Sequence, residues 1–350
     1  MEITFSNRVV AAFAVTVIAV GVQAGTARAG AARAGAGSRP AGSTVVQDAT
    51  GAAARAAAVR YWTPARMAAA LRAADGQPAA RTVSRTRQLV RKPAPAKPRT
   101  PAPAPTAAWL RGDTGGTGLP WTHGGAVAAA VGKVFFTLGG EDYACSGTLV
   151  GGKGTDVVLT AAHCVTGGPG KDGATRWATN WMFAPGFVNG LLPYGEYTAR
   201  RFFVSKDWTG PLGGREQYDA AFVQVTTVTL HGASSAAQAP SGLPVKFAGR
   251  QDSAPLSRAY VFGYPAELPY SGLYLDYCAG SVVASGGSVR TPCGMTAGDS
   301  GGPWLAGFSP RSGSGEVVAV STYKVSGSPR ALYGAVLGPQ ARALYVRAVS

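Results

Sequence analysis

From Trp121 onward the chain is a succession of short apolar segments, each interrupted by glycine or polar residues. Many short strands at near-regular spacing, without helical patterns between them, predict an all-β barrel or sandwich. The final segment begins with a proline after a glycine, which predicts one closing helix over 339–348. The segments rich in β-branched or aromatic residues are 133–138, 145–150, 156–165, 220–228, 259–264, 280–286, 316–325 and 331–338.

The front third of the chain has a different composition. Residues 1–119 are dominated by Ala, Arg, Gly and Pro, and hold 16 Lys and Arg against 4 Asp and Glu. Residues 120–350 hold 17 against 13, so most of the net charge of +16 lies in the front third. Nucleic-acid binding would need basic residues interleaved with aromatics on a folded face. A low-complexity basic arm instead predicts a solvated segment and no nucleic-acid partner.

The N-terminus has the pattern of an export signal. An apolar run from Val9 to Val22 is too short to span a membrane, and small-residue cleavage sites end at Ala24 and Ala29. A membrane anchor or a buried helix is the alternative, and Glu2 offsets the single Arg8 before the run. We expect a signal peptide over 1–29, a secreted product, and no stable membrane association once the signal is removed.

Residues 30–119 are interpreted as a pro-segment and a Pro/Ala/Arg-rich linker. The stretch 61–76 has a helix start at Thr63 and Pro64 and a stop at Gly76. Its apolar residues Met67, Ala70 and Leu71 would share one face of that helix. The stretch 91–105 carries proline at nearly every second or third position, which favours extended polyproline II. A permanent tail that is never removed is the alternative.

Four cysteines suit an exported protein. Cys145, Cys164, Cys278 and Cys293 form two well-separated pairs without a C-x-x-C motif, and three connectivities are possible. Pairing of near neighbours would contribute about 3 kcal/mol for each loop closed. With only three histidines and no clustered ligand spacing, we expect no metal site. The adjacent acids at 141 and 142 fall short of the six to eight oxygens that calcium takes.

The segment GMTAGDSGGPW, residues 294–304, presents one serine, Ser300, among four glycines. Glycine is costly to order, so such a cluster marks a backbone shape that other residues cannot adopt. A plain turn is one explanation. The other is that backbone N–H groups point at something that the serine attacks.

Two further polar residues stand at strand ends. His163 closes the apolar strand LTAAHCV, and Asp219 begins the strand YDAAFVQV. Each residue alone is more often a structural hydrogen-bonding group than a catalytic one. The order His, Asp, Ser along one chain favours a catalytic role for all three.

These three motifs resemble those of the trypsin-like, chymotrypsin-fold serine peptidases. The resemblance rests on TAAHC around His163, YDAAFV around Asp219 and GDSGGPW around Ser300, and it covers residues 125–345. Secreted bacterial members near the glutamyl endopeptidases are the most similar group. The resemblance implies an all-β fold of two perpendicular six-stranded β-barrels with a short C-terminal helix, in a peptidase domain over 120–350.

The resemblance also implies the roles of the residues. His163 would act as general base and acid, and Asp219 would orient it and stabilise the imidazolium. The backbone N–H groups of Gly298 and Ser300 would form the oxyanion hole, where one donor is worth about 3–4 kcal/mol. The implied disulfides are Cys145 with Cys164 and Cys278 with Cys293, which staple the histidine loop and the loop that enters the active serine.

The presumed substrate pocket departs from the family pattern. Gly294 stands where trypsin has an acid, and Val320 where glutamyl endopeptidases have a histidine, so neither preference has a visible anchor. With Gly294 and Met295 at the base of the pocket, we expect a preference for substrates with apolar or small side chains. Ser321 would contribute a backbone contact to the substrate. No IVGG-like new N-terminus is present, which leaves the partner of Asp299 open.

The sequence therefore predicts a secreted serine endopeptidase, made as a precursor, that cleaves polypeptides through an acyl-enzyme on Ser300. We expect a monomer that needs no cofactor, since no phosphate-cradling glycine loop precedes a helix. A non-catalytic binding module on a protease fold, or an esterase with the same triad, remains the alternative.

Overall fold

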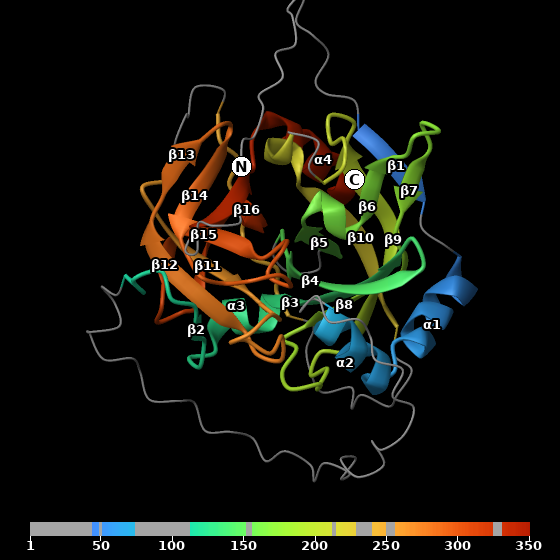
Figure 1. The fold of residues 1–350 in the computed structure, drawn as a ribbon, viewed down its shortest axis with the longest axis horizontal. Helices are drawn as coiled ribbons and strands as arrows, with labels where there is room; N and C mark the ends of the chain where they lie inside the picture. The colour runs from blue at the N-terminus through green and yellow to red at the C-terminus, as the bar shows by residue number, and fades with distance from the viewer. Residues whose placement is uncertain are drawn as a thin grey trace, which may run out of the picture. The chain divides into compact units, whose positions relative to one another are not determined.

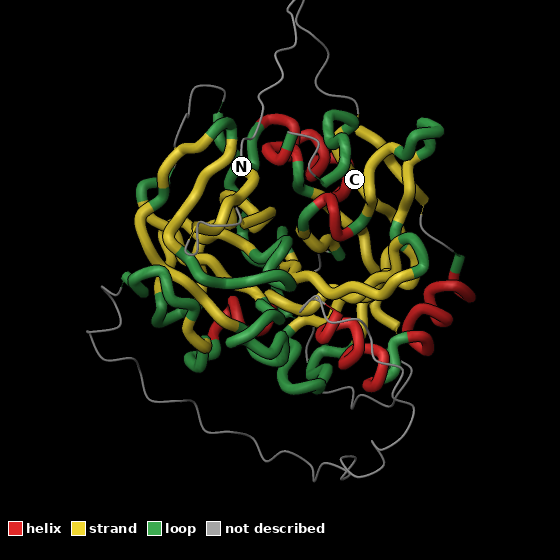
Figure 2. Tube along the Cα trace, in the orientation of Figure 1, coloured by secondary structure: helices red, strands yellow, loops and turns green. Residues whose placement is uncertain are grey.

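The computed structural model describes residues 44–48, 51–73, 113–151, 156–211, 215–228, 240–249, 256–324 and 331–350. All of them belong to one compact unit, Pro40–Ser350. The expected signal peptide, 1–29, and the expected polyproline linker, 91–105, lie outside the described residues. Strands far outnumber helices in the described residues, and the helices are short (Figure 2). No helix of the described part is long and apolar enough to cross a membrane.

The first sheet closes into a barrel. Its strands run in the order β3–β4–β5–β10–β9–β8, and β8 pairs with both β3 and β9, which completes the ring (Figure 1). The expectation of a six-stranded barrel is therefore confirmed for this half. The strands are β3 (Val131–Leu138), β4 (Glu141–Leu149), β5 (Val157–Thr160), β8 (Thr179–Pro185), β9 (Glu196–Ser205) and β10 (Ala221–Val228).

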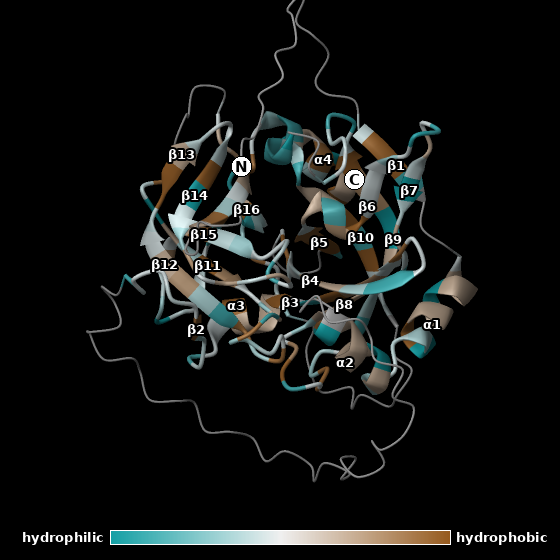
Figure 3. Ribbon diagram, in the orientation of Figure 1, coloured by the Kyte–Doolittle hydropathy of each residue, from teal (hydrophilic) through white to brown (hydrophobic). Residues whose placement is uncertain are grey.

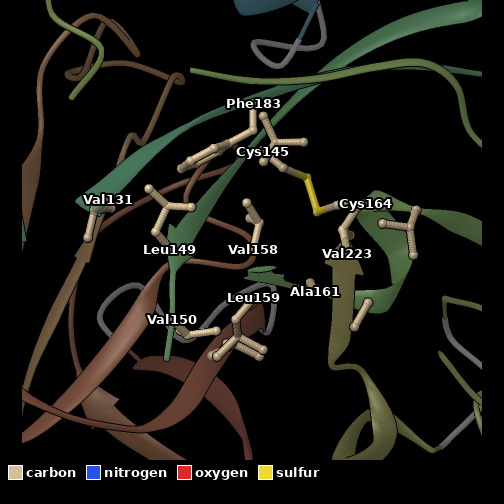
Figure 4. Packing of buried hydrophobic residues seen from close by; sticks show 14 of the residues in the cluster. Val131, Cys145, Leu149, Val150, Val158, Leu159, Ala161, Cys164, Phe183 and Val223 are labelled. Carbon is tan, nitrogen blue, oxygen red and sulfur yellow. A yellow bond between two sulfur atoms is a disulfide. The ribbon is translucent and has the colours of Figure 1, made fainter. Parts of the chain in front are cut away.

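The core of this barrel follows from strands that are apolar on their inner face. All four residues of β5 are buried, and hydrophobic residues, brown in Figure 3, concentrate in β5 and β10. Figure 4 shows Val158 of β5 between Leu149 and the disulfide of Cys145 with Cys164, and Leu159 of the same strand beside Val150. Burial of each such side chain contributes about 1.5–3 kcal/mol.

The second sheet contains the other six strands expected, in the order β14–β17–β16–β15–β11–β12, with β13 added at one edge and β2 at the other. Its two end strands do not form a hydrogen-bonded ladder in the described residues; the Cys278–Cys293 disulfide joins β12 to the residue after β14 instead. This half is thus an open sheet of eight strands rather than a closed barrel of six. The strands are β2 (Leu119–Pro120), β11 (Arg258–Gly263), β12 (Asp276–Ser281), β13 (Val283–Ser285), β14 (Ser288–Pro292), β15 (Pro303–Ser309), β16 (Ser314–Lys324) and β17 (Ala331–Val336).

The smaller elements connect and cover the two sheets. The closing helix is confirmed as α4 (Pro339–Val349), which begins with the proline and buries Ala341, Leu344 and Ala348. A short helix α3 (Gly125–Ala130) precedes β3, and β6 (Thr166–Pro169) pairs with β7 (Thr175–Trp177). There are also two single 3₁₀ turns: η2 (Ala162–Cys164) contains His163, and η3 (Glu216–Tyr218) ends immediately before Asp219.

Part of the front third also folds. β1 (Thr44–Asp48) pairs with β9, and α1 (Ala52–Tyr61) and α2 (Pro64–Ala73) follow it. The expected helix start at Pro64 and the buried face of Met67, Ala70 and Leu71 are both confirmed. The expectation that this region is solvated does not hold for residues 44–73, because several of its side chains join the barrel core.

Candidate active site

The candidate histidine is placed by the end of β5. His163 lies in η2, directly after the buried residues Ala161 and Ala162. The next residue, Cys164, is bonded to Cys145 of β4, so the turn is tied covalently to the barrel, as the resemblance implied. The histidine side chain keeps 22% of its surface exposed. It therefore reaches solvent while its backbone is fixed.

Asp219 is brought to His163 by the pairing of their strands. β10, which begins two residues after Asp219, runs antiparallel to β5, with Ala221 opposite Thr160. The carboxylate is 3% exposed and accepts the backbone N–H of His163 at 2.9 Å. Its other oxygen lies 2.7 Å from His163 Nδ1. This arrangement leaves Nε2 as the free ring nitrogen.

The electrostatics of the pair favour a protonated ring. Burial by itself lowers the pKa of His163, but the charge of Asp219 and the hydrogen bond to it more than offset this, so the pKa is raised above 6.5. An imidazolium at this place is therefore stabilised by its carboxylate partner. That is the property a general base needs once it has taken a proton.

Ser300 lies in the turn before β15 and is anchored to the first barrel. Its carbonyl oxygen accepts the N–H of Ser146 at 2.8 Å, and the next residue, Gly301, donates to Ser321 at 2.8 Å. Ser300 and His163 both line one cavity of about 420 Å³. No hydrogen bond joins the two side chains among the described residues. Such bonds are often long in free enzymes and tighten on binding.

Gly298 has the conformation expected of an oxyanion-hole residue. Its φ is +95°, a value that favours glycine, and an added Cβ would lie 2.7 Å from the backbone carbonyl oxygen of Tyr264. The N–H groups of Gly298 and Ser300 donate to no other protein atom in the described residues. Two unengaged donors beside one hydroxyl form a site for a developing oxyanion.

Asp299 lies in a buried cluster with Lys133 of β3 and Asp276 of β12. Burial raises the pKa of Asp299 to about 7, although the Ser321 hydroxyl and the Lys133 charge oppose the rise. Neither carboxylate oxygen accepts a hydrogen bond of acceptable geometry, not even from the Ser321 hydroxyl. Burial lowers the pKa of Lys133 to about 7, against the attraction of Asp299 and Asp276.

Lys133 is a charged neighbour of Asp299 that sequence reasoning did not find. Its Nζ donates a hydrogen bond to the backbone oxygen of Tyr264 at 2.8 Å, and the side chain is fully buried. The Tyr264 N–H in turn donates to Ser146 Oγ, which donates to the Gly298 oxygen. The lysine thus supports the backbone behind the oxyanion hole. Its position in an apolar strand gave no signal of that role.

A second cavity of about 280 Å³ adjoins Ser300 on the side of β16. Ser321 lines it, but its N–H, its C=O and its hydroxyl are already bonded to Gly302, Gly301 and Trp304. The substrate-binding candidates Gly294 and Met295 are placed differently. Gly294 accepts a hydrogen bond from Lys324 Nζ at 3.3 Å, whereas Met295 is fully buried in the second core cluster.

Lys324 and Glu267 are additional charged residues of this second cavity. They come from β16 and from the loop between β11 and β12, far apart in sequence. Sequence reasoning missed both, because only the packing of the second sheet brings them together. They add polar character to a pocket for which the sequence predicted a preference for apolar or small substrate side chains.

One group of potential metal ligands occurs near the site. Cys145, His163 and Cys164 offer atoms within 4.8 Å of one another. The two sulfurs are bonded to each other, however, and a disulfide lacks the thiolate that binds metals. We therefore assign no metal to these residues.

The comparisons with known proteins agree with this geometry. Residues 145–320, half of the chain, match the family model of the trypsin-like peptidase domain. The comparison with curated proteins found no match. Both the histidine and the serine candidates lie within the matched range, as does Asp219.

Two solved protease structures with TM-scores above 0.5 share the fold. The protease Anisep from Arthrobacter nicotinovorans is 33% identical, with a TM-score of 0.54, over 63% of this chain and 95% of that one. A thermostable serine protease, AL20, from an extremophilic microorganism is 28% identical, with a TM-score of 0.54, over 64% and 98%. A Glu endopeptidase is 18% identical, with a TM-score of 0.49, over 66% and 95%.

Proposed function

The chain belongs to the trypsin-like peptidase family, and from that premise we propose that it is a secreted serine endopeptidase with Ser300 as its nucleophile. The observation that carries the proposal is the buried carboxylate of Asp219, held 2.7 Å from His163 Nδ1 in a cavity shared with Ser300. A histidine oriented in this way is the partner that a weakly nucleophilic hydroxyl requires.

In the proposed reaction, Ser300 Oγ attacks the carbonyl carbon of the scissile bond while His163 Nε2 takes the hydroxyl proton. The N–H groups of Gly298 and Ser300 stabilise the negative charge on the carbonyl oxygen. The carbon–nitrogen bond then breaks, and the imidazolium gives its proton to the leaving amine. Water repeats the sequence on the acyl-enzyme and frees the acid product.

The proposed division of the chain assigns 1–29 to a signal peptide, 30–119 to a pro-segment and linker, and 120–350 to the peptidase domain. Both disulfides are formed, which is consistent with an extracellular location. We propose a monomer whose partner is a polypeptide substrate. No nucleic acid or cofactor enters the reaction.

Labelling with a fluorophosphonate probe tests the nucleophile. The secreted protein should be labelled, and Ser300→Ala should remove the label while melting at the same temperature as the wild type. An absence of labelling in a correctly folded wild type would contradict the proposal and favour a binding module. The mass and N-terminal residue of the labelled band report which part of the precursor has been removed.

Peptides blocked at both ends separate the possible activities. An endopeptidase cleaves them internally, whereas an exopeptidase requires a free terminus. Hydrolysis of activated esters with no cleavage of any blocked peptide would contradict the endopeptidase assignment and indicate an esterase. Ser300→Ala is the control in both assays.

A further inference from the structure

Helix α2 lies outside the matched range 145–320, yet it packs into the first barrel next to the candidate site. Trp62, just before the helix, packs its ring against Phe135 of β3, with centroids 5.3 Å apart. Met67 and Leu71 of the helix are 5% and 6% exposed and belong to the same core cluster. Figure 1 shows α1 and α2, in blue, beside the strands of this barrel.

Polar contacts fix the start of α2 to β4. The Asp142 carboxylate accepts the Tyr61 hydroxyl at 2.8 Å and the Thr137 hydroxyl at 2.7 Å, and it lies 3.3 Å from Arg66. The Trp62 indole N–H also donates to the backbone oxygen of Asn180 in β8. Bonds to two strands set both the position and the direction of the helix.

The C-terminal half of α2 reaches the catalytic cavity. Ala70, 1% exposed, lines the same cavity as His163, Ser300 and Gly298. Leu71 approaches Gly272, where an added Cβ would lie 2.9 Å from the leucine side chain and 3.3 Å from Lys133 Nζ. Ala70 therefore faces the cleft, and the next residue, Leu71, lies over the buried Lys133.

The chemistry of the proposed reaction assigns the two cavities. Ser300 lines both cavities, so the scissile bond lies between them, and one cavity takes the acyl part of the peptide while the other takes the leaving part. The larger cavity contains His163, which protonates the leaving amine. It therefore receives the leaving-group side, and its remaining lining includes the apolar side chains of Phe136, Leu138 and Pro211.

We propose that α2 is a permanent wall of the leaving-group subsite, and that the small side chain of Ala70 lets this subsite accept a large apolar side chain after the scissile bond. The inference rests on the proposed peptidase function, and it requires that α2, although part of the proposed pro-segment, stays bound to the barrel after any cleavage of the precursor. A methyl group at this position bounds the cavity without filling it, since about 420 Å³ remains and His163 stays 22% exposed. The segment thus completes the cleft rather than blocking it.

Replacement of Ala70 by a larger residue tests the subsite. Two sets of quenched fluorescent peptides, alike except for Leu or Gly directly after the scissile bond, give a Leu/Gly ratio of kcat/KM. Ala70→Phe should lower this ratio at least tenfold, because the new ring occupies the space for Leu. Ala65→Phe is the matched control, since Ala65 lies on the exposed face of the same helix, and it should leave the ratio within twofold.

Ala70→Gly keeps the test decisive if the phenylalanine variant fails to fold. Removal of the methyl group enlarges the space, so the Leu/Gly ratio should stay the same or rise. A ratio unchanged in a folded Ala70→Phe, or lowered in Ala70→Gly, would overturn the inference. Fluorophosphonate labelling of the wild type separates this failure from failure of the proposed function, because labelling requires only Ser300, His163 and the oxyanion hole.

The permanence of the wall is tested by nicking the chain. A recognition sequence for a specific protease is inserted between α2 and Asp113, and the folded full-length protein is cut there. The N-terminal fragment should remain bound during gel filtration, with the Leu/Gly ratio unchanged. Release of the fragment together with a rise in peptide cleavage would show an inhibitory pro-segment and overturn the inference.

Discussion

Asp219 holds His163 at two points: one carboxylate oxygen accepts the histidine backbone N–H at 2.9 Å, and the other lies 2.7 Å from its ring Nδ1. The first bond fixes the position of the residue and the second fixes the orientation and tautomer of its ring. Because the carboxylate is 3% exposed, water does not compete strongly for either bond. The relationship leads directly to the first two predictions.

Asp219→Asn should lower kcat by about 10⁴, the loss seen when a triad carboxylate becomes an amide. The amide has only one accepting oxygen, and its NH₂ favours the ring tautomer in which Nε2 carries the hydrogen. Such a ring does not accept the serine proton. Steady-state cleavage of a blocked peptide measures the loss. Asp207→Asn is the control, because the Asp207 carboxylate lies 3.7 Å from Arg215 in a partly exposed ion pair. A loss below tenfold in Asp219→Asn would contradict the catalytic role of Asp219.

The pH profile of kcat/KM should fall toward acid through a pKa above 6.5. The pKa of His163 is raised, because the effect of Asp219 exceeds that of burial, so the ring stays protonated to a higher pH than a free histidine. Only the neutral ring accepts the Ser300 proton, and activity is therefore lost on the acid side. The measurement uses a substrate without titratable groups. An acid limb centred below 6.5 would show that burial exceeds the effect of Asp219.

The features that sequence predicted are those fixed by local chemistry. The segments around His163 and Ser300 carry their roles in a few adjacent residues, and strand pairing then places Asp219 beside the histidine. The disulfides follow the family pairing, and the Gly–Pro start of α4 is a local signal. Each of these depends little on where the rest of the chain lies.

The features that sequence missed depend on long-range packing. α1 is an alanine-rich helix with only Ala58 and Val59 buried, so its sequence shows no clear apolar face. β1 forms because it pairs with the stretch of β9 from Arg201 to Ser205, beyond the residues that pair with β8, and this stretch belongs to another part of the chain. A lysine in an apolar strand, such as Lys133, reveals its role only when a second sheet covers it.

The free energy of unfolding should rise with pH between about 7 and 10.5, because burial lowers the pKa of Lys133 from 10.5 to about 7. Over this range the unfolded chain binds a proton at this lysine that the folded chain does not, so stability increases as the pH rises. Lys133→Met removes the lysine and should lose this rise. Urea unfolding at the two ends of the range measures the free energy.

Lys246→Met is the control for this loss. Lys246 pairs with Glu316 at 3.2 Å on the surface, and such exposed pairs contribute about 0–1 kcal/mol. A rise with pH that persists in Lys133→Met, or that is lost equally in both variants, would contradict the lowered pKa of Lys133. The rate of fluorophosphonate labelling should fall in Lys133→Met alone, since only this lysine supports the backbone behind Gly298.

Gly298→Ala should reduce kcat by about 10²–10³, as expected when one oxyanion donor is lost. The added methyl would lie 2.7 Å from the Tyr264 oxygen, so the peptide must rotate and its N–H turns away from the cleft. Gly307→Ala is the matched control, because Gly307 also has a positive φ, +56°, but nothing lies within 4 Å of its added Cβ. The positive φ strains the alanine in both variants, but only in Gly298→Ala does the added methyl group also meet the Tyr264 backbone oxygen. Equal activity in the two variants would show that the Gly298 N–H does not stabilise the transition state, whereas a loss in kcat with little change in KM would locate its effect there.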